Sequence, residues 1–393
     1  MEDGFSTETK KSNKIWLVLG IIVIVLLGVL LIFNAANSGS STGKAVTGSE
    51  KEPIKIGSIG PLTGDVSSIG LNEKAAIELA VDEINSKGGI SGRKIQVIYE
   101  DGKCSAKDGS NAANKLMNID NVVAIIGGTC SSETIASAPI AEETKTVMIS
   151  PCSSSPKITE IGDYIFRDYP SDSYQGAEAA NFIYNNLGKK KVAVLYVLSD
   201  WGVGIQQVFE PKFKDLGGEI VASEGYEQTT KDLRTQLTKI KQANPDVIYF
   251  LGYTEASAIG LKQIKELGIN AEIVGGDAWD DKVIFEKAGD AAEGIIFFIP
   301  YAPLTSEFKE SMKEKLGSNE ITICSSQAYD GVYLLKQVIE KVGTDPTKIK
   351  DELYKIKDYP GVSGTISFDS NGDLEKAQYA IKVVRNGNSQ NLN

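Results

Sequence analysis

The chain has no histidine among its 393 residues. This absence excludes Ser-His-Asp hydrolases, Cys-His proteases, His-ligated zinc sites and histidine pH switches. Cysteine is scarce as well, with four residues and no C-x-x-C pair, which disfavours zinc, iron–sulfur and thioredoxin-like sites. We therefore expect no metal, no cofactor and no catalytic residues.

Positive charge is also in short supply. The 41 Lys and Arg residues stand against 52 Asp and Glu, which gives a formal net charge of −11, and no basic stripe is visible. Because phosphate backbones require clustered Lys and Arg, nucleic acid is excluded as a partner. Hydrophobic residues make up 41% of the chain and charged residues 24%, which excludes a largely disordered protein.

Residues 15–33 lack both charge and proline. At about 1.5 Å per residue, a helix of this length spans roughly 28 Å, close to the hydrocarbon thickness of a membrane. Three lysines precede the segment and the next is Lys44, so residues 1–14 are predicted to be a cytoplasmic stub. The length favours an uncleaved transmembrane signal anchor. A cleaved signal ending near Ala35 and Ala36 is the alternative.

The segment 34–52 is rich in Gly, Ser and Ala and has no periodicity. This composition predicts a flexible linker. Together with the anchor, it predicts that everything that follows lies outside the cytoplasm and is held at the cell membrane.

From residue 54 onward, short apolar runs alternate with stretches of helical periodicity. The runs predict strands at 54–59, 94–99, 122–126, 146–149, 191–198, 219–226, 247–252, 273–275 and 294–299. Repeated β-α-β units imply an α/β fold of parallel sheets covered by helices on both faces. Two such series predict two lobes rather than one oversized sheet.

The even number of cysteines in an extracytoplasmic chain suggests disulfides, and four cysteines allow three pairings. Cys104 follows the predicted second strand and Cys130 follows the third. The carboxyl ends of adjacent parallel strands lie at one edge of a sheet, so this pairing is geometrically natural. Cys152 and Cys324 then remain, either as a second bridge or as buried free thiols.

Serines gather after two strands of the first series, where doubly wound sheets bind ligands. Ser131 and Ser132 follow the third strand at the start of a helix, and 150–156 follows the fourth. Hydroxyls and free backbone N–H groups at a helix start suit an anion. A single serine there is commonly a plain helix cap. Two clusters at neighbouring strand ends favour a cradle for a carboxylate or phosphate.

The corresponding strand ends of the second series are acidic and aromatic. They carry Asp200 with Trp201, the segment 252–255 and the segment 276–280. Such groups suit an ammonium, through ion pairing and cation–π contact. Lobe packing is the alternative role for Trp201 or Trp279, and helix capping for Asp280 or Asp281. An anion cradle on one lobe that faces a cation site on the other matches a zwitterion.

These motifs, in this order, make the chain resemble the type I solute-binding proteins of amino-acid ABC transporters, specifically their leucine/isoleucine/valine-binding branch. The resemblance covers about 54–384, and the matching stretches include GPLTG at 60–64, GGTCSS at 127–132, ISPCSSSP at 149–156, YPSDSYQG at 169–176 and FLGYTEA at 250–256. It implies a hinged trap of two Rossmann-like lobes. Lobe one would comprise 53–171 plus 302–360, and lobe two 172–301 plus 361–390. The family disulfide would fall on Cys104 and Cys130.

The resemblance also implies ligand-binding roles for individual residues. The ligand carboxylate would bind Ser131, Ser132 and Ser154, and the ammonium would bind Asp277 and the Ser153 carbonyl. Trp201 and either Tyr253 or Thr254 would cover the ligand, and Ile69 would line the side-chain pocket. Cys152-Ser153-Ser154 stands where the family has Gly-Ala-Thr, and Asp277 where it has Glu. Both departures keep an amino acid as the ligand class but leave its side chain open.

The implied function is binding without chemistry. The protein would be a monomeric, membrane-tethered component that delivers an amino acid to the permease subunits of an ABC transporter. A receptor domain that senses a small amide or carboxylate and acts through a partner is the alternative. An enzyme ranks third, because without histidine no nucleophile–base pair is recognisable.

Overall fold

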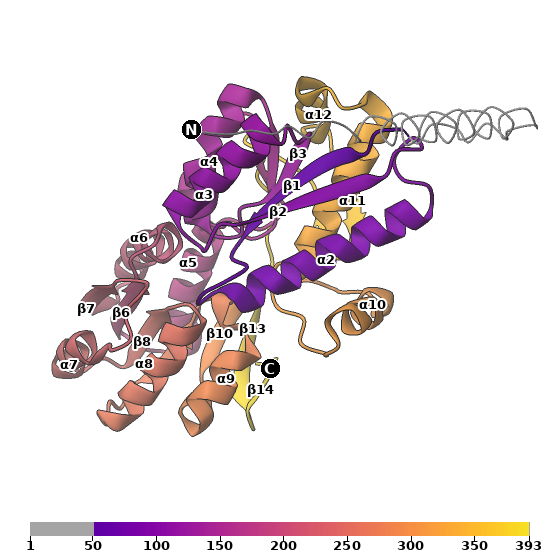
Figure 1. Cartoon of the computed structure of the whole chain (residues 1–393). Coiled ribbons are helices and arrows are strands. Elements are labelled where there is room, and N and C mark those ends of the chain that lie inside the picture. Colours follow the sequence, from indigo (N-terminus) through magenta and orange to yellow (C-terminus); the bar gives the residue numbers. More distant parts are fainter. Residues whose placement is uncertain (1–50, 393) are drawn as a thin grey trace, which may run out of the picture. The chain divides into compact units, whose positions relative to one another are not determined.

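Two sheets organise the residues that this computed structural model describes, 51–392 (Figure 1). The predicted cytoplasmic stub at 1–14, the anchor at 15–33 and all but the last two residues of the linker at 34–52 lie outside the described residues. Within 51–392, no helix combines the length and the apolar character needed to cross a membrane.

The first sheet is entirely parallel, with strand order β2-β1-β3-β4-β5. Its strands are β1 (Ile54–Gly60), β2 (Ile95–Asp101), β3 (Ala124–Gly127), β4 (Val147–Ser150) and β5 (Ile165–Arg167). Successive residues of β3 face opposite sides. Ala124 and Ile126 join the core under one layer of helices, and Ile125 joins the core under the other. Burial on both faces explains why these strands appear in the sequence as continuous apolar runs.

Helices from distant parts of the chain cover the first sheet (Figure 1). One face carries α2 (Ser67–Ser86), α10 (Ser306–Leu316), α11 (Ser325–Val342) and α12 (Pro346–Leu353), and the other carries α3 (Ala106–Asn114) with η1 (Lys115–Ile119) and α4 (Ser131–Thr144). A short helix η2 (Pro156–Ile158) follows β4. We call the first sheet with these helices lobe one.

The second sheet is mixed, with strand order β14-β13-β10-β9-β8-β6-β7. Its parallel strands are β6 (Lys191–Val197), β7 (Glu219–Tyr226), β8 (Val247–Leu251), β9 (Glu272–Gly275) and β10 (Ile296–Pro300). The strands β13 (Tyr379–Arg385) and β14 (Asn388–Asn391) extend it in antiparallel pairing. The predicted parallel sheets are confirmed, and the second sheet becomes antiparallel only at this edge, where the chain returns from lobe one to pair with β10.

The helices of the second sheet complete lobe two. They are α5 (Asp172–Asn181), η3 (Phe182–Asn186), α6 (Asp200–Asp215), α7 (Arg234–Ala243), α8 (Thr254–Glu266), η4 (Asp277–Trp279), α9 (Lys282–Ala288) and η5 (Gly289–Ala292). The chain passes between the lobes after β5, after β10 and before β13. A small hairpin of β11 (Tyr359–Gly361) and β12 (Gly364–Ile366) precedes the last passage. Ile366 and Phe368, from the stretch assigned to lobe two, pack into the core of lobe one.

Two disulfides anchor the loops at the carboxyl ends of strands of the first sheet. Cys104, after β2, is bonded to Cys130, which caps α4, with a Cα–Cα distance of 5.2 Å. Cys152, after β4, is bonded to Cys324, which directly precedes α11, also at 5.2 Å. The second pair is therefore a bridge, the first of the two alternatives that the sequence left open.

Candidate functional site

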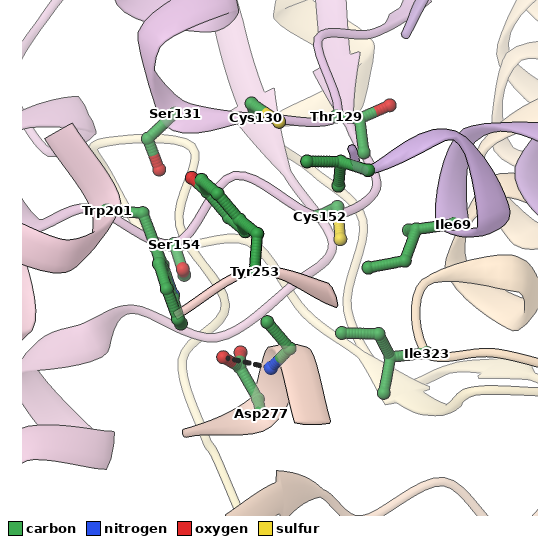
Figure 2. A pocket seen from close by; sticks show the side chains of 12 residues that line it. Ile69, Thr129, Cys130, Ser131, Cys152, Ser154, Trp201, Tyr253, Asp277 and Ile323 are labelled. Carbon is green, nitrogen blue, oxygen red and sulfur yellow. Dashed lines mark hydrogen bonds between the residues drawn. The ribbon is translucent and has the colours of Figure 1, made fainter. Parts of the chain in front are cut away.

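A pocket lies between the carboxyl ends of the strands of the two lobes (Figure 2). Lobe one contributes Val66, Ile69, Thr129, Cys130, Ser131, Cys152, Ser154 and Ile323, and lobe two contributes Trp201, Tyr253, Asp277 and Ala278. Six of the nine predicted ligand-binding residues are in this set. The position follows the rule for parallel α/β sheets, which bind ligands beyond their carboxyl ends.

Ser131 places a hydroxyl and a helix N-terminus at the pocket. It is the first residue of α4, and its Oγ accepts a hydrogen bond from the Ser155 N–H at 3.1 Å. That bond occupies the oxygen as an acceptor, so the hydroxyl proton is available to a ligand. The first N–H groups of a helix lack intrahelical partners and carry the positive end of its dipole. This wall of the pocket therefore suits a carboxylate.

Glu133 holds the start of α4 in place. Its carboxylate accepts hydrogen bonds from the backbone N–H groups of Cys104 and Cys130, both at 2.9 Å. Burial raises the pKa of Glu133 to about 7, although these hydrogen bonds favour the charged form. The disulfide between the same two cysteines fixes the loop that Glu133 caps.

Asp277 lies at the opposite wall, at the start of η4, and is 2% exposed. Its carboxylate accepts hydrogen bonds from the Tyr169 hydroxyl at 2.8 Å and from the Ala278 N–H at 3.0 Å. Burial raises the pKa of Asp277 above its usual range, and the hydrogen bond from Tyr169 opposes that shift. A buried carboxylate of this kind is stabilised in its charged form by a cation.

A second buried carboxylate, Asp172, stands behind the first. Gln175 links the two, because its amide donates to Asp172 at 2.9 Å and its oxygen accepts from the Asp277 N–H at 2.9 Å. Burial raises the pKa of Asp172 strongly, and the negative charge of Asp277 raises it further. One carboxylate oxygen of Asp172 has no hydrogen-bond partner within 51–392. This wall thus holds two buried carboxylates and suits an ammonium.

Sequence reasoning missed Tyr169, Asp172 and Gln175 as site residues. They lie in the stretch YPSDSYQG, which served only to identify the family resemblance. The available signal was the Asp-x-x-Gln spacing, which puts two polar side chains on the same face of the first helical turn after a strand.

Two aromatic rings close the pocket from lobe two. Trp201, near the start of α6, stacks on Tyr253 with ring centroids 5.0 Å apart and an interplanar angle of 23°. Both residues are 5% exposed. Trp279 instead serves lobe packing. Its indole N–H donates to the Gly252 carbonyl at 3.1 Å, and its ring meets Phe250 edge-on.

Three predicted residues have side chains outside the pocket lining, because each has another partner. The Ser132 hydroxyl donates to Asp200 at 3.0 Å, across the two lobes. The Ser153 hydroxyl donates to the Gly128 carbonyl at 2.9 Å, and the Thr254 hydroxyl donates to Asp281 at 2.7 Å. The remaining lining residues, which the sequence reasoning did not select, are mostly apolar: Val66, Thr129, Cys130, Cys152, Ala278 and Ile323.

Direct contacts join the lobes around the pocket. The Ser68 hydroxyl donates to Asp281 at 2.5 Å, and the Glu255 N–H donates to Asp65 at 2.9 Å. On another side of the pocket, Lys157 pairs with Asp200 at 3.1 Å. The lobes are therefore in a closed arrangement, with direct contacts beside the pocket.

One group of side chains has the composition of a metal site. Among the described residues, one ligand atom each of Glu73, Cys152 and Cys324 lies within 4.8 Å of the other two. Both sulfurs are bonded to one another, so neither is a thiolate that could bind a metal.

Known proteins resemble the chain in both sequence and structure. A family profile described as "Periplasmic binding protein" matches residues 53–388. A leucine-, isoleucine-, valine-, threonine- and alanine-binding protein of Pseudomonas aeruginosa is 31% identical, over 84% of this chain and 89% of its own. A leucine-binding protein from Thermotoga maritima has a TM-score of 0.80 at 32% identity, covering 86% of this chain and 98% of that one.

Two further solved structures were determined with ligands. A branched-chain amino acid transporter substrate-binding protein from Streptococcus pneumoniae, in complex with isoleucine, has a TM-score of 0.78 at 29% identity and covers 86% and 99% of the two chains. A solute-binding protein of an ABC transporter from Rhodopseudomonas palustris, in complex with 3,4-dihydroxybenzoic acid, has a TM-score of 0.76 at 25% identity and covers 87% and 96%.

Proposed function

The chain belongs to the periplasmic binding protein family, and from that premise we propose that it is the extracytoplasmic substrate-binding component of an ABC transporter for an amino acid. One observation carries the choice of an amino acid. A helix N-terminus with Ser131 and a buried carboxylate, Asp277, face the same pocket from opposite lobes. A ligand that carries both a carboxylate and an ammonium complements both walls at once.

In this proposal the ligand carboxylate accepts hydrogen bonds from the hydroxyls of Ser131 and Ser154 and from the first N–H groups of α4. The ammonium pairs with Asp277, and Asp172 adds negative potential from behind. The stacked rings of Trp201 and Tyr253 exclude water from these charges, which strengthens both interactions. The apolar Val66, Ile69, Ala278 and Ile323 remain for the side chain.

Closure couples this binding to transport. A ligand that touches both lobes stabilises the closed state by its differential affinity for the closed and open states. The hinge would lie in the three passages between lobes, at 167–172, 300–306 and 366–379. The closed form would then dock, as a monomer, on the permease subunits. A tether formed by 15–33 and 34–52 would keep it at high effective concentration beside them.

A second candidate is a receptor for a carboxylate without an ammonium, acting through a partner. The observation in its favour is that the Ser131 wall can bind an anion without help from Asp277. A thermal-shift screen of the full chain against amino acids, small amides, carboxylates and sugars separates the two. Saturating ligand at 100 times its dissociation constant adds about 2.7 kcal/mol of stability. Shifts confined to amino acids support the transporter component, and shifts with acids or amides alone reject it.

A further inference from the structure

The Cys152–Cys324 disulfide forms part of the pocket wall. Cys152 lines the pocket, and Cys324 directly follows Ile323, another lining residue. In Figure 2, Ser154 and Trp201 lie on one side of the Cys152 sulfur, and the apolar side chains of Ile69 and Ile323 lie on the other. The disulfide therefore forms part of the same wall as the apolar side chains of Ile69 and Ile323.

The apolar end is where a ligand side chain would lie. Its lining consists of Val66, Ile69, Ala278 and Ile323 together with Cys152. A zwitterion held between Ser131 and Asp277 directs its side chain away from these polar groups, since the remaining wall offers mainly carbon and sulfur. How far the ligand side chain can extend depends on which of these lining residues can move.

The disulfide is the part of the wall that can move least. An isoleucine can change rotamer, whereas the cross-link ties the loop after β4 to the start of α11 across 5.2 Å between Cα atoms. Behind it lies Glu73, with a carboxylate oxygen within 4.8 Å of both sulfurs. Glu73 is 4% exposed and accepts a hydrogen bond from Thr129 at 2.5 Å. The sulfurs are thus backed by a buried carboxylate, one oxygen of which is held by Thr129 while the other has no hydrogen-bond partner within 51–392.

We propose that the Cys152–Cys324 disulfide sets the length limit of the ligand side chain, so that the site prefers short aliphatic amino acids to longer unbranched ones. This rests on the proposed function, because the side-chain end is defined by the carboxylate and ammonium walls. Each methylene that fits adds about fourfold in affinity. The first methylene that meets the disulfide reverses the trend, because a close-packed wall resists added volume.

The test is calorimetric titration of the full chain with alanine, 2-aminobutyrate, norvaline and norleucine, each one methylene longer than the last. The wild type should show affinity that rises about fourfold per methylene to a maximum and then falls at least tenfold. In Cys152→Ala/Cys324→Ala the maximum should move to a side chain at least one methylene longer. If that variant does not fold by circular dichroism, Cys152→Ser/Cys324→Ser, which also removes the cross-link, takes its place with the same expectation.

The matched control is Cys104→Ala/Cys130→Ala, which removes the other disulfide beside the carboxylate wall. It should weaken the binding of every ligand of the series by a similar factor and leave the affinity maximum at the same chain length. A maximum at the same chain length in the wild type and in the Cys152/Cys324 variants would overturn the proposal. Failure of the wild type to bind any of the four would instead refute the amino-acid assignment itself, so the two failures are distinguishable.

Discussion

Replacing Asp277 by Asn removes the charge of the ammonium wall and changes its shape little. The asparagine oxygen can still accept a hydrogen bond from Tyr169 or from the Ala278 N–H, which the carboxylate accepts at 2.8 and 3.0 Å. Truncating one partner of a buried, hydrogen-bonded charge pair costs about 2–5 kcal/mol. We therefore expect Asp277→Asn to weaken amino-acid binding by about 30-fold to several thousand-fold.

The same substitution should act in the opposite direction on the ligand-free protein. Burial raises the pKa of Asp277, so its ionisation is unfavourable in the unliganded native state, a cost that asparagine does not carry. The melting temperature without ligand should stay level or rise while affinity falls. Calorimetric titration and thermal unfolding of the purified chain measure both. The matched control is Asp330→Asn, a buried carboxylate of lobe one that accepts hydrogen bonds from the Val362 and Ser363 N–H groups and lies outside the pocket lining.

Two results would refute this reasoning. One is an affinity within about threefold of wild type, which would show that no cation pairs with Asp277. The other is an equal loss for an amino acid and for the corresponding carboxylic acid without its amino group, which would show that the substitution acts on the fold of the pocket rather than on a charge pair.

Three further predictions concern the other wall, the closed state and pH. Ser131→Ala should weaken binding by about 10- to 150-fold in titration, because a hydrogen bond to a charged group contributes about 1.5–3 kcal/mol; an unchanged affinity would remove α4 from the site. Asp281→Ala breaks the bond from Ser68 between the lobes at 2.5 Å, so small-angle scattering without ligand should show a larger radius of gyration than for wild type; identical profiles would contradict this. Glu133 has a folded pKa of about 7 against a usual 4.5, so the native state keeps a proton that the unfolded chain has lost. Glu133 should thus lower the free energy of unfolding by about 3 kcal/mol between pH 5 and 8, and the decrease should be less steep in Glu133→Gln. Equal decreases in the two proteins would contradict this prediction.

The strands and the place of the site could be predicted from the sequence because both depend on local patterns. Runs buried on both faces are continuously apolar, and ligands bind at the carboxyl ends of parallel strands, so Ser131 and Asp277 could be placed on opposite walls. The antiparallel pairing of β13 with β10 could not be predicted, because edge pairing depends on where a distant segment returns.

Individual side chains proved harder to place than elements. Ser132 follows Ser131 directly, yet its side chain turns to Asp200 because adjacent residues on a helix point about 100° apart. The spacing of Asp172 and Gln175 shows that they share a helix face, but their place behind Asp277 depends on where α5 lies beside η4. The role of Cys152 in the pocket wall likewise depends on Cys324, 172 residues away along the chain.

The proposed function requires that one ligand engage both walls of the pocket at once. The decisive measurement is calorimetric titration of the full chain with the best-binding amino acid, with its analogue that lacks the amino group and with its analogue that lacks the carboxylate. We predict that each analogue binds at least 30-fold more weakly than the amino acid, in line with the loss of about 2 kcal/mol or more per wall. An analogue that binds as tightly as the amino acid would contradict the account, because the wall that it does not touch would then contribute nothing.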